Sequence, residues 1–139
     1  MKISTSKLEI HSLVTPMGKP RMTRRDKWLD PPRPCVAKYR TFKDMLRHDA
    51  IQAGYSADLF DVHWIEVKAY IPMPSSWSKK KRYEMYLKPH RQKPDADNIL
   101  KGVCDTLLKD DSGVWRKIVE KRWSYLPGLS ITIRSIVKP

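Results

Sequence analysis

The segment that most constrains this chain covers residues 93–111 and reads KPDADNILKGVCDTLLKDD. Apolar residues recur in it at intervals of three and four, the spacing of one stripe on a helix; they are Ile99, Leu100, Val103, Cys104, Leu107 and Leu108. Pairs of aspartates stand at its two ends, Asp95 and Asp97 before the stripe and Asp110 and Asp111 after it. The pattern predicts an amphipathic helix over residues 97–108 with acidic residues at both ends.

Four acidic residues in one segment need a reason in a chain whose formal net charge is +13. Carboxylates one residue apart, with a lysine nearby, are the oxygen ligands that a divalent cation such as Mg²⁺ prefers. Such a cation can activate water and stabilise charge on a phosphate. Lys101 lies one helical turn after Asp97 and can reach the same place. The alternative is that Asp97 or Asn98 caps the helix and that Asp97 pairs with Lys101 on the surface; the residue types alone leave both readings open.

The order and spacing of this segment resemble the core motif of the RusA-type Holliday junction resolvases. The matching residues are Asp95-x-Asp97-Asn98-x-x-Lys101, then Asp105-x-Leu107, then Asp110-Asp111-x-x-Val114. That family consists of small, dimeric, often prophage-borne endonucleases that cut four-way DNA junctions with magnesium. The resemblance implies that Asp95, Asp97 and Asp111 bind Mg²⁺, that Mn²⁺ can substitute, and that these aspartates and Lys101 are catalytic. Asp110 is a further candidate ligand.

Length and composition favour one folded domain over residues 1–139. No apolar run is long enough to span a membrane and the first residues form no signal peptide, so a cytoplasmic, nucleoid-associated protein is expected. Cys35 and Cys104 are far apart and lack neighbouring metal ligands, which argues against a zinc site or a disulfide. Cys104 falls on the apolar stripe and is expected in the core.

The excess of positive charge, with a pI near 9.9, is typical of a polyanion-binding protein. One basic segment is the proline-rich loop expected over residues 15–40, and another is a short helix capped by Ser75 or Ser76. The candidate DNA-binding residues are Lys19, Arg21, Arg24, Arg25, Lys79, Lys80, Lys81, Arg82 and Lys93. Trp28, within the loop, could stack on an unpaired base or pack against the protein itself.

Alternating apolar residues predict strands over residues 8–14, 62–71, 114–125 and 129–137. A further helix is expected over residues 41–53, because Thr41 and Asp44 have the form of a capping box and Gly54 follows. Together these elements indicate an α+β domain with about four mostly antiparallel strands and two or three helices on one face. The strand order cannot be derived from the pattern.

The length of the central helix predicts a dimer. Residues 97–108 would span about 16 Å, and residues 109–111 can retrace at most about 10 Å of it. Asp111 therefore falls short of a metal held by Asp95 and Asp97 of its own chain. Two copies with antiparallel helices would form two composite sites, so an intertwined homodimer is expected, as the resemblance also implies.

Two other functions compete with a metal-dependent junction endonuclease. A noncatalytic basic nucleic-acid-binding module would explain the cations and tryptophans, but it gives the four aspartates no purpose beyond capping. A basic ribonuclease or toxin would need a pair of acid–base histidines, and no such pairing is evident among His11, His48, His63 and His90. A proton-shuttle role for His90, near the acidic motif, stays open.

Overall fold

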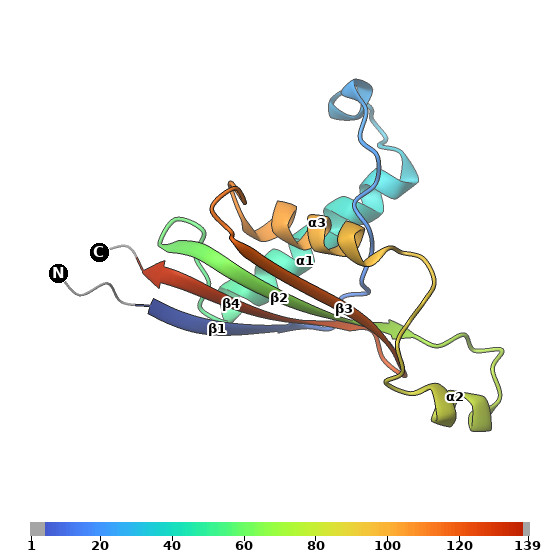
Figure 1. Cartoon of the computed structure of the whole chain (residues 1–139). Coiled ribbons are helices and arrows are strands. Elements are labelled where there is room, and N and C mark those ends of the chain that lie inside the picture. The colour runs from blue at the N-terminus through green and yellow to red at the C-terminus, as the bar shows by residue number, and fades with distance from the viewer. Residues whose placement is uncertain (1–4, 138–139) are drawn as a thin grey trace.

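A computed structural model describes residues 5–137 and shows an α+β domain with three α-helices and one four-stranded sheet (Figure 1). The elements in chain order are β1 (Thr5–Ser12), the short 3₁₀ helix η1 (Arg24–Lys27), α1 (Pro34–Gln52), β2 (Phe60–Pro72), α2 (Lys79–Met85), α3 (Ala96–Leu107), β3 (Arg116–Ser124) and β4 (Gly128–Val137). The predicted fold class is confirmed. Among the described residues, no helix is both long and apolar enough to cross a membrane.

The sheet has the strand order β1-β4-β2-β3. Strand β4 pairs antiparallel with both β1 and β2, so the sheet is mostly antiparallel, as predicted. Strands β2 and β3 are parallel, because the connection through α2 and α3 carries the chain back to the end of the sheet at which β2 begins. This crossover places the N-terminal end of α3 at the carboxyl end of β2 (Figure 1).

Helices α1 and α3 cover one face of the sheet (Figure 1). Alternate residues of the two central strands point under them, and Ile65, Val67 and Ile131 are fully buried. The apolar stripe of α3 faces the same core, where Ile99 and Val103 are also fully buried. The core role expected for Cys104 is confirmed: the residue is buried, and burial raises the pKa of its thiol to about 11.

The expected start of the first helix at Thr41 is wrong. Helix α1 begins at Pro34, so residues 34–40 of the expected loop are helical. Proline is well suited to the first helical turn, because its fixed φ matches the helix and its missing amide would have no partner there. Thr41 instead lies inside the helix and its hydroxyl donates to the carbonyl of Ala37 at 3.2 Å. Strand β1 also ends earlier than predicted, at Ser12.

Two helix caps differ from the prediction as well. Helix α2 is capped by Ser78, whose hydroxyl accepts from the amide of Lys81 at 3.1 Å, and not by Ser75 or Ser76, which precede it in a turn. The N-cap of α3 is Asp95, not Asp97 or Asn98. Its carboxylate nevertheless caps none of the first-turn amides, all of which the structure describes.

Candidate active site

The two aspartates that precede and open α3 present their side chains to solvent. Asp95 and Asp97 are both exposed, and the side chain of Asp97 is 75% accessible. Lys101 follows one turn later, with its Nζ 4.0 Å from Asp97 Oδ2, which confirms the predicted proximity. Because the N-terminal end of a helix carries partial positive charge, it favours carboxylates and other anions at this position. Of the alternative to metal binding, the surface pair between Asp97 and Lys101 is present, whereas the predicted cap by Asp97 or Asn98 is not, since the N-cap position is taken by Asp95.

The segment leading into Asp95 is held on the edge of β3. The Nζ of Lys121 donates to the carbonyls of Gln92 at 2.5 Å and Pro94 at 2.7 Å. Before it, the amide of Leu87 donates to the carbonyl of Trp123 at 2.8 Å. The backbone next to the acidic pair is thus fixed by a lysine that lies 26 positions after Asp95 in the chain.

His90 belongs to this support. Its side chain is buried, its ring centroid lies 4.3 Å from that of Trp123, and its amide donates to the carbonyl of Lys121 at 3.0 Å. Burial and the positive charge of Lys121 lower the pKa of the imidazole, so the ring is neutral at pH 7. This position gives His90 a packing role beside the site.

The basic segment around Lys19 is hydrogen-bonded to the first turn of α3. The side-chain amide of Asn98 donates to the carbonyl of Lys19 at 3.2 Å, and the amide of Lys19 donates to the carbonyl of Asn98 at 3.4 Å. Gly18 allows this approach, since a Cβ there would lie 2.3 Å from the Asn98 Nδ2. These bonds leave the Nζ of Lys19 within 3.4 Å of Asp105, two turns along α3.

Asp105 joins three parts of the molecule. It accepts a hydrogen bond from the Tyr39 hydroxyl at 2.6 Å and pairs with Lys43 at 3.2 Å, both on α1, besides Lys19. Partial burial works to raise its pKa, but the bonds from Tyr39 and Lys43 and the charges of both lysines hold the pKa of Asp105 below its usual value. The sequence predicted only a capping role for Asn98 and none for Asp105, although both residues belong to the RusA-like motif.

The second acidic pair follows the C-terminal end of α3. Asp110 stabilises the turn there, because its two oxygens accept from the amide and the hydroxyl of Ser112 at 3.0 and 2.9 Å, which lowers its pKa. Asp111 is exposed and pairs with Lys117 at 2.7 Å, a contact that raises the pKa of the lysine.

A pocket of about 280 Å³ lies along α3 and brings several of these residues together. Its lining includes Lys101, Asp105, Asp110 and Asp111. Asp95 and Asp97 are not part of that described lining, and no three His, Cys, Asp or Glu side chains among residues 5–137 are placed to hold one metal ion together. The carboxylate oxygens suit Mg²⁺, but one chain does not assemble Asp95, Asp97 and Asp111 around a common point.

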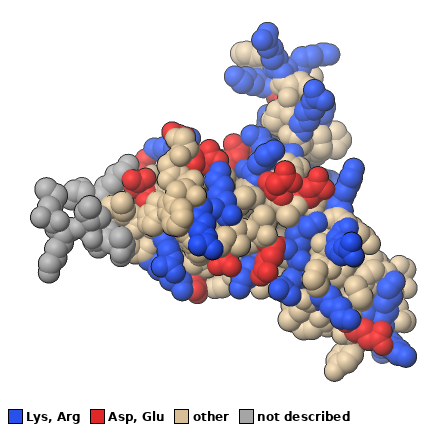
Figure 2. Space-filling model, in the orientation of Figure 1, with Lys and Arg blue, Asp and Glu red and all other residues tan. Residues whose placement is uncertain are grey.

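Two basic lobes flank the N-terminal end of α3. Figure 2 shows Lys and Arg over the projecting arm formed by residues 15–33 and over the region of α2 at the opposite corner. Of the predicted DNA-binding residues, eight are exposed or partly exposed: Lys19, Arg21, Arg24, Arg25, Lys79, Lys80, Lys81 and Lys93. Among them Lys19 pairs with Asp105, and the Nζ of Lys81 lies 4.2 Å from the ring of Trp77. Arg82 differs, since it is half-buried and its guanidinium lies 5.4 Å from the ring of Tyr125.

Trp28, on the arm, is 84% exposed. The alternative in which this tryptophan packs against its own protein is therefore wrong.

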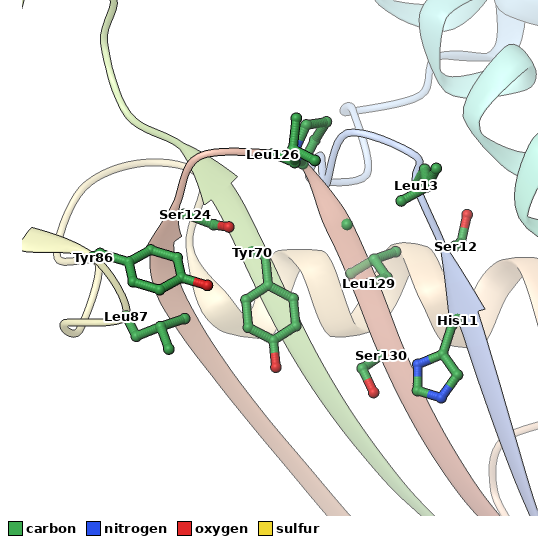
Figure 3. A pocket seen from close by; sticks show the side chains of 12 residues that line it. His11, Ser12, Leu13, Tyr70, Tyr86, Leu87, Ser124, Leu126, Leu129 and Ser130 are labelled. Atoms are coloured by element: carbon green, nitrogen blue, oxygen red, sulfur yellow. The ribbon is translucent and has the colours of Figure 1, made fainter. Parts of the chain in front are cut away.

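A separate pocket of about 390 Å³ opens on the sheet face that the helices leave uncovered (Figure 3). His11, Tyr70 and Ser130 line it from three neighbouring strands, and its described lining contains no carboxylate. The aspartates of the candidate site thus do not line this pocket.

Comparison with known proteins adds two findings. A family model described as endodeoxyribonuclease RusA matches residues 13–134, a span that includes the arm, the acidic motif and most of the sheet. The chain is also 33% identical over 138 residues to the uncharacterized protein YqaN of Bacillus subtilis (strain 168), and the alignment covers 94% of this chain and 96% of that relative.

Proposed function

The chain belongs to the RusA family of endodeoxyribonucleases, enzymes that resolve Holliday junctions, and we propose that it cuts four-way DNA junctions with Mg²⁺ in recombination and repair. The observation that carries this proposal is the group formed by Asp95, Asp97 and Lys101, which is open to solvent and lies between two basic lobes. Membership of the family removes the two competing functions, a noncatalytic binding module and a ribonuclease.

Nucleases of this family depend on a metal. In our proposal Asp95 and Asp97 of one chain would hold Mg²⁺ together with Asp111 of a second copy, and Mn²⁺ could substitute. When bound, the metal supplies an activated water and neutralises charge on the phosphate. Asp110 contributes to the turn through Ser112, so we assign metal binding to Asp111 first.

The protein's own groups then position the DNA. Lys101 places its ammonium 4.0 Å from Asp97, where it can also pair with a phosphate oxygen of the strand to be cut. The arm and α2 contribute cations on both sides, and these bind the phosphate backbone without reading its sequence. The aspartates would repel DNA in the absence of a cation, so we expect productive binding of the scissile phosphate to be coupled to the metal.

We propose a homodimer because α3 separates the two acidic pairs of one chain. The helix has 12 residues, which separates its ends by about 18 Å. Asp111 does not fold back along the helix, because it pairs with Lys117 just after the first residue of β3. A second copy with its α3 antiparallel would bring its own Asp111 to the acidic pair, giving two sites suited to paired cuts on a symmetric junction. Since the substrate is DNA, we place this activity in the cytoplasm, at the nucleoid.

The test is cleavage of a labelled four-way junction by the wild-type protein with and without Mg²⁺. Asp97→Asn should lower the rate about 100-fold or more, while junction binding stays intact or tightens because a negative charge near phosphate is gone. Lys101→Ala should also lose cleavage. Asp44→Asn is the matched control, since Asp44 is an exposed aspartate on α1 whose side chain is 80% accessible. Cleavage by Asp97→Asn at the wild-type rate would show that the metal site lies elsewhere.

A further inference from the structure

We propose that the arm formed by residues 15–33 is a preorganised stacking device, which holds Trp28 against an unstacked base at the centre of branched DNA. This inference rests on the proposed junction-cutting function and names the feature of the substrate that the arm recognises. Its central residues, Trp28, Asp26 and Arg33, lie outside the acidic motif.

The tip of the arm is held by one buried carboxylate. Asp26 is 2% exposed and accepts from the amide and the hydroxyl of Thr23 at 2.6 and 3.1 Å. Arg33 adds two bonds to the same carboxylate, each 2.8 Å, and its guanidinium also donates to the carbonyl of Arg21 at 2.9 Å. Hydrogen bonds from Arg33 and Thr23 hold the pKa of Asp26 well below its usual range. Both ends of the turn are thereby tied to one point, so η1 keeps a defined shape without a hydrophobic core.

That shape exposes a large apolar ring. All five tryptophans of the chain lie in the described residues, and Trp28 is the most exposed of them. Trp77 packs on Trp123, and Trp64 lies under Arg134. Trp115, which is 71% exposed, donates its indole N–H to His63 at 3.2 Å. Within residues 5–137, Trp28 has neither a ring contact nor a side-chain hydrogen bond.

The surroundings of Trp28 indicate its occupant. Arg24, Arg25 and Lys27 of η1 are all exposed, and Figure 2 shows the projecting arm studded with cations. An aromatic face surrounded by cations suits a nucleobase whose phosphates are bound at the same time, because every base offers a π-face and every phosphate a charge. Bases inside a continuous duplex are already stacked, so the free base must be one at a branch point.

The arm is also anchored beside the proposed catalytic group. Its base is strapped to Asn98, the residue after Asp97, by the two bonds of Lys19. Trp28 is nine positions after Lys19, so its Cα lies at most about 32 Å from that of Lys19, and Figure 1 shows the arm projecting from the side of the sheet that α3 covers. A base held by Trp28 would therefore place the crossover next to the strand to be cut.

The experiment is a double-mutant cycle on binding, measured with Ca²⁺ in place of Mg²⁺ to prevent cleavage. Wild type and Trp28→Ala are titrated against a four-way junction and against the same junction with abasic residues at its centre. Stacking on one base predicts that Trp28→Ala weakens binding to the intact junction by roughly 10-fold to 100-fold and changes binding to the abasic junction little. Trp28→Phe should keep most of the affinity, because it keeps a π-face.

Trp115→Ala is the control, as it removes another exposed tryptophan that lies outside the arm, and it should change neither affinity. Asp26→Asn tests the clamp: it should speed tryptic cleavage after Arg24 and Arg25 and weaken binding to the intact junction. The stacking role would be overturned if Trp28→Ala lost the same affinity for both junctions or lost affinity for neither. It would also be overturned if Trp28→Ala no longer formed the wild-type dimer, since Trp28 would then act at the dimer interface. Wild-type protein that neither binds nor cuts the junction would instead refute the proposed function.

Discussion

If Asp111 of one copy completes the metal site of the other, two inactive variants should regain activity in a mixed dimer. Asp95→Asn and Asp111→Asn chains carry different affinity tags, are expressed together, and are purified through both tags so that only mixed dimers remain. Each homodimer of these variants has two broken sites. In the mixed dimer, one site receives both substituted residues and the other receives neither, so it should nick the junction at about half of the wild-type rate.

The need for a second chain depends on the distance between the two acidic pairs of α3. Carboxylates that share one Mg²⁺ must have oxygens within about 4 Å of one another. The 12 residues of α3 separate its ends by about 18 Å, and the four residues that follow, 108–111, could recover about 14 Å only if they ran fully extended back along the helix. They do not run this way, because Asp111 pairs with Lys117 at 2.7 Å, and no three possible ligands among residues 5–137 are grouped to hold one metal ion.

The assay distinguishes nicked from doubly cut junctions on a denaturing gel, because one intact site can cut only one strand. A mixture of Asp95→Asn with Asp97→Asn is the control. These two substitutions affect the same donor pair, so each mixed dimer has two broken sites and should stay inactive. Failure of the Asp95→Asn and Asp111→Asn mixture to nick would mean that all ligands come from one chain, and the argument from helix length would be refuted.

Three further outcomes are expected. Gly18→Ala should destabilise the protein by about 1 kcal/mol in urea unfolding, because the Asn98 side chain must turn away from the new Cβ and lose its bond to the Lys19 carbonyl, whereas Gly113→Ala has open space and should be near neutral. Neutralising residues 79–82 should flatten the salt dependence of junction binding by about one unit of slope per lost phosphate contact, and an unchanged slope would place the DNA elsewhere. The pKa of His90 is lowered in the folded state, so the folded protein is disfavoured when this residue takes up a proton. Its contribution to stability is full above the unfolded pKa of about 6.5 and falls as the pH drops below that value. Between pH 7.5 and pH 5.5 the melting temperature should therefore fall less for His90→Gln than for the wild type.

The sequence by itself determined the elements whose information is local. The stripe of α3 and the alternation in β2 each lie within one short run of residues, and period alone indicates which side is buried. The group of Asp95, Asp97 and Lys101 could be predicted for the same reason, since all three fall within two helical turns. Helix ends were less predictable, because proline at the start of α1 and serine before α2 offered several competing starts.

Only the tertiary structure decided how distant segments support that group. Asn98 meets Lys19 across 79 residues of sequence, and Asp105 meets Tyr39 across 66. The parallel pairing of β2 with β3, which brings Lys121 under Pro94, is equally non-local. The exposure of Trp28 also depends on folding, since the bonds between Arg33 and Asp26 join the two ends of the turn that carries it. No periodic pattern encodes such contacts, because each depends on where the whole chain places two residues that are far apart along it.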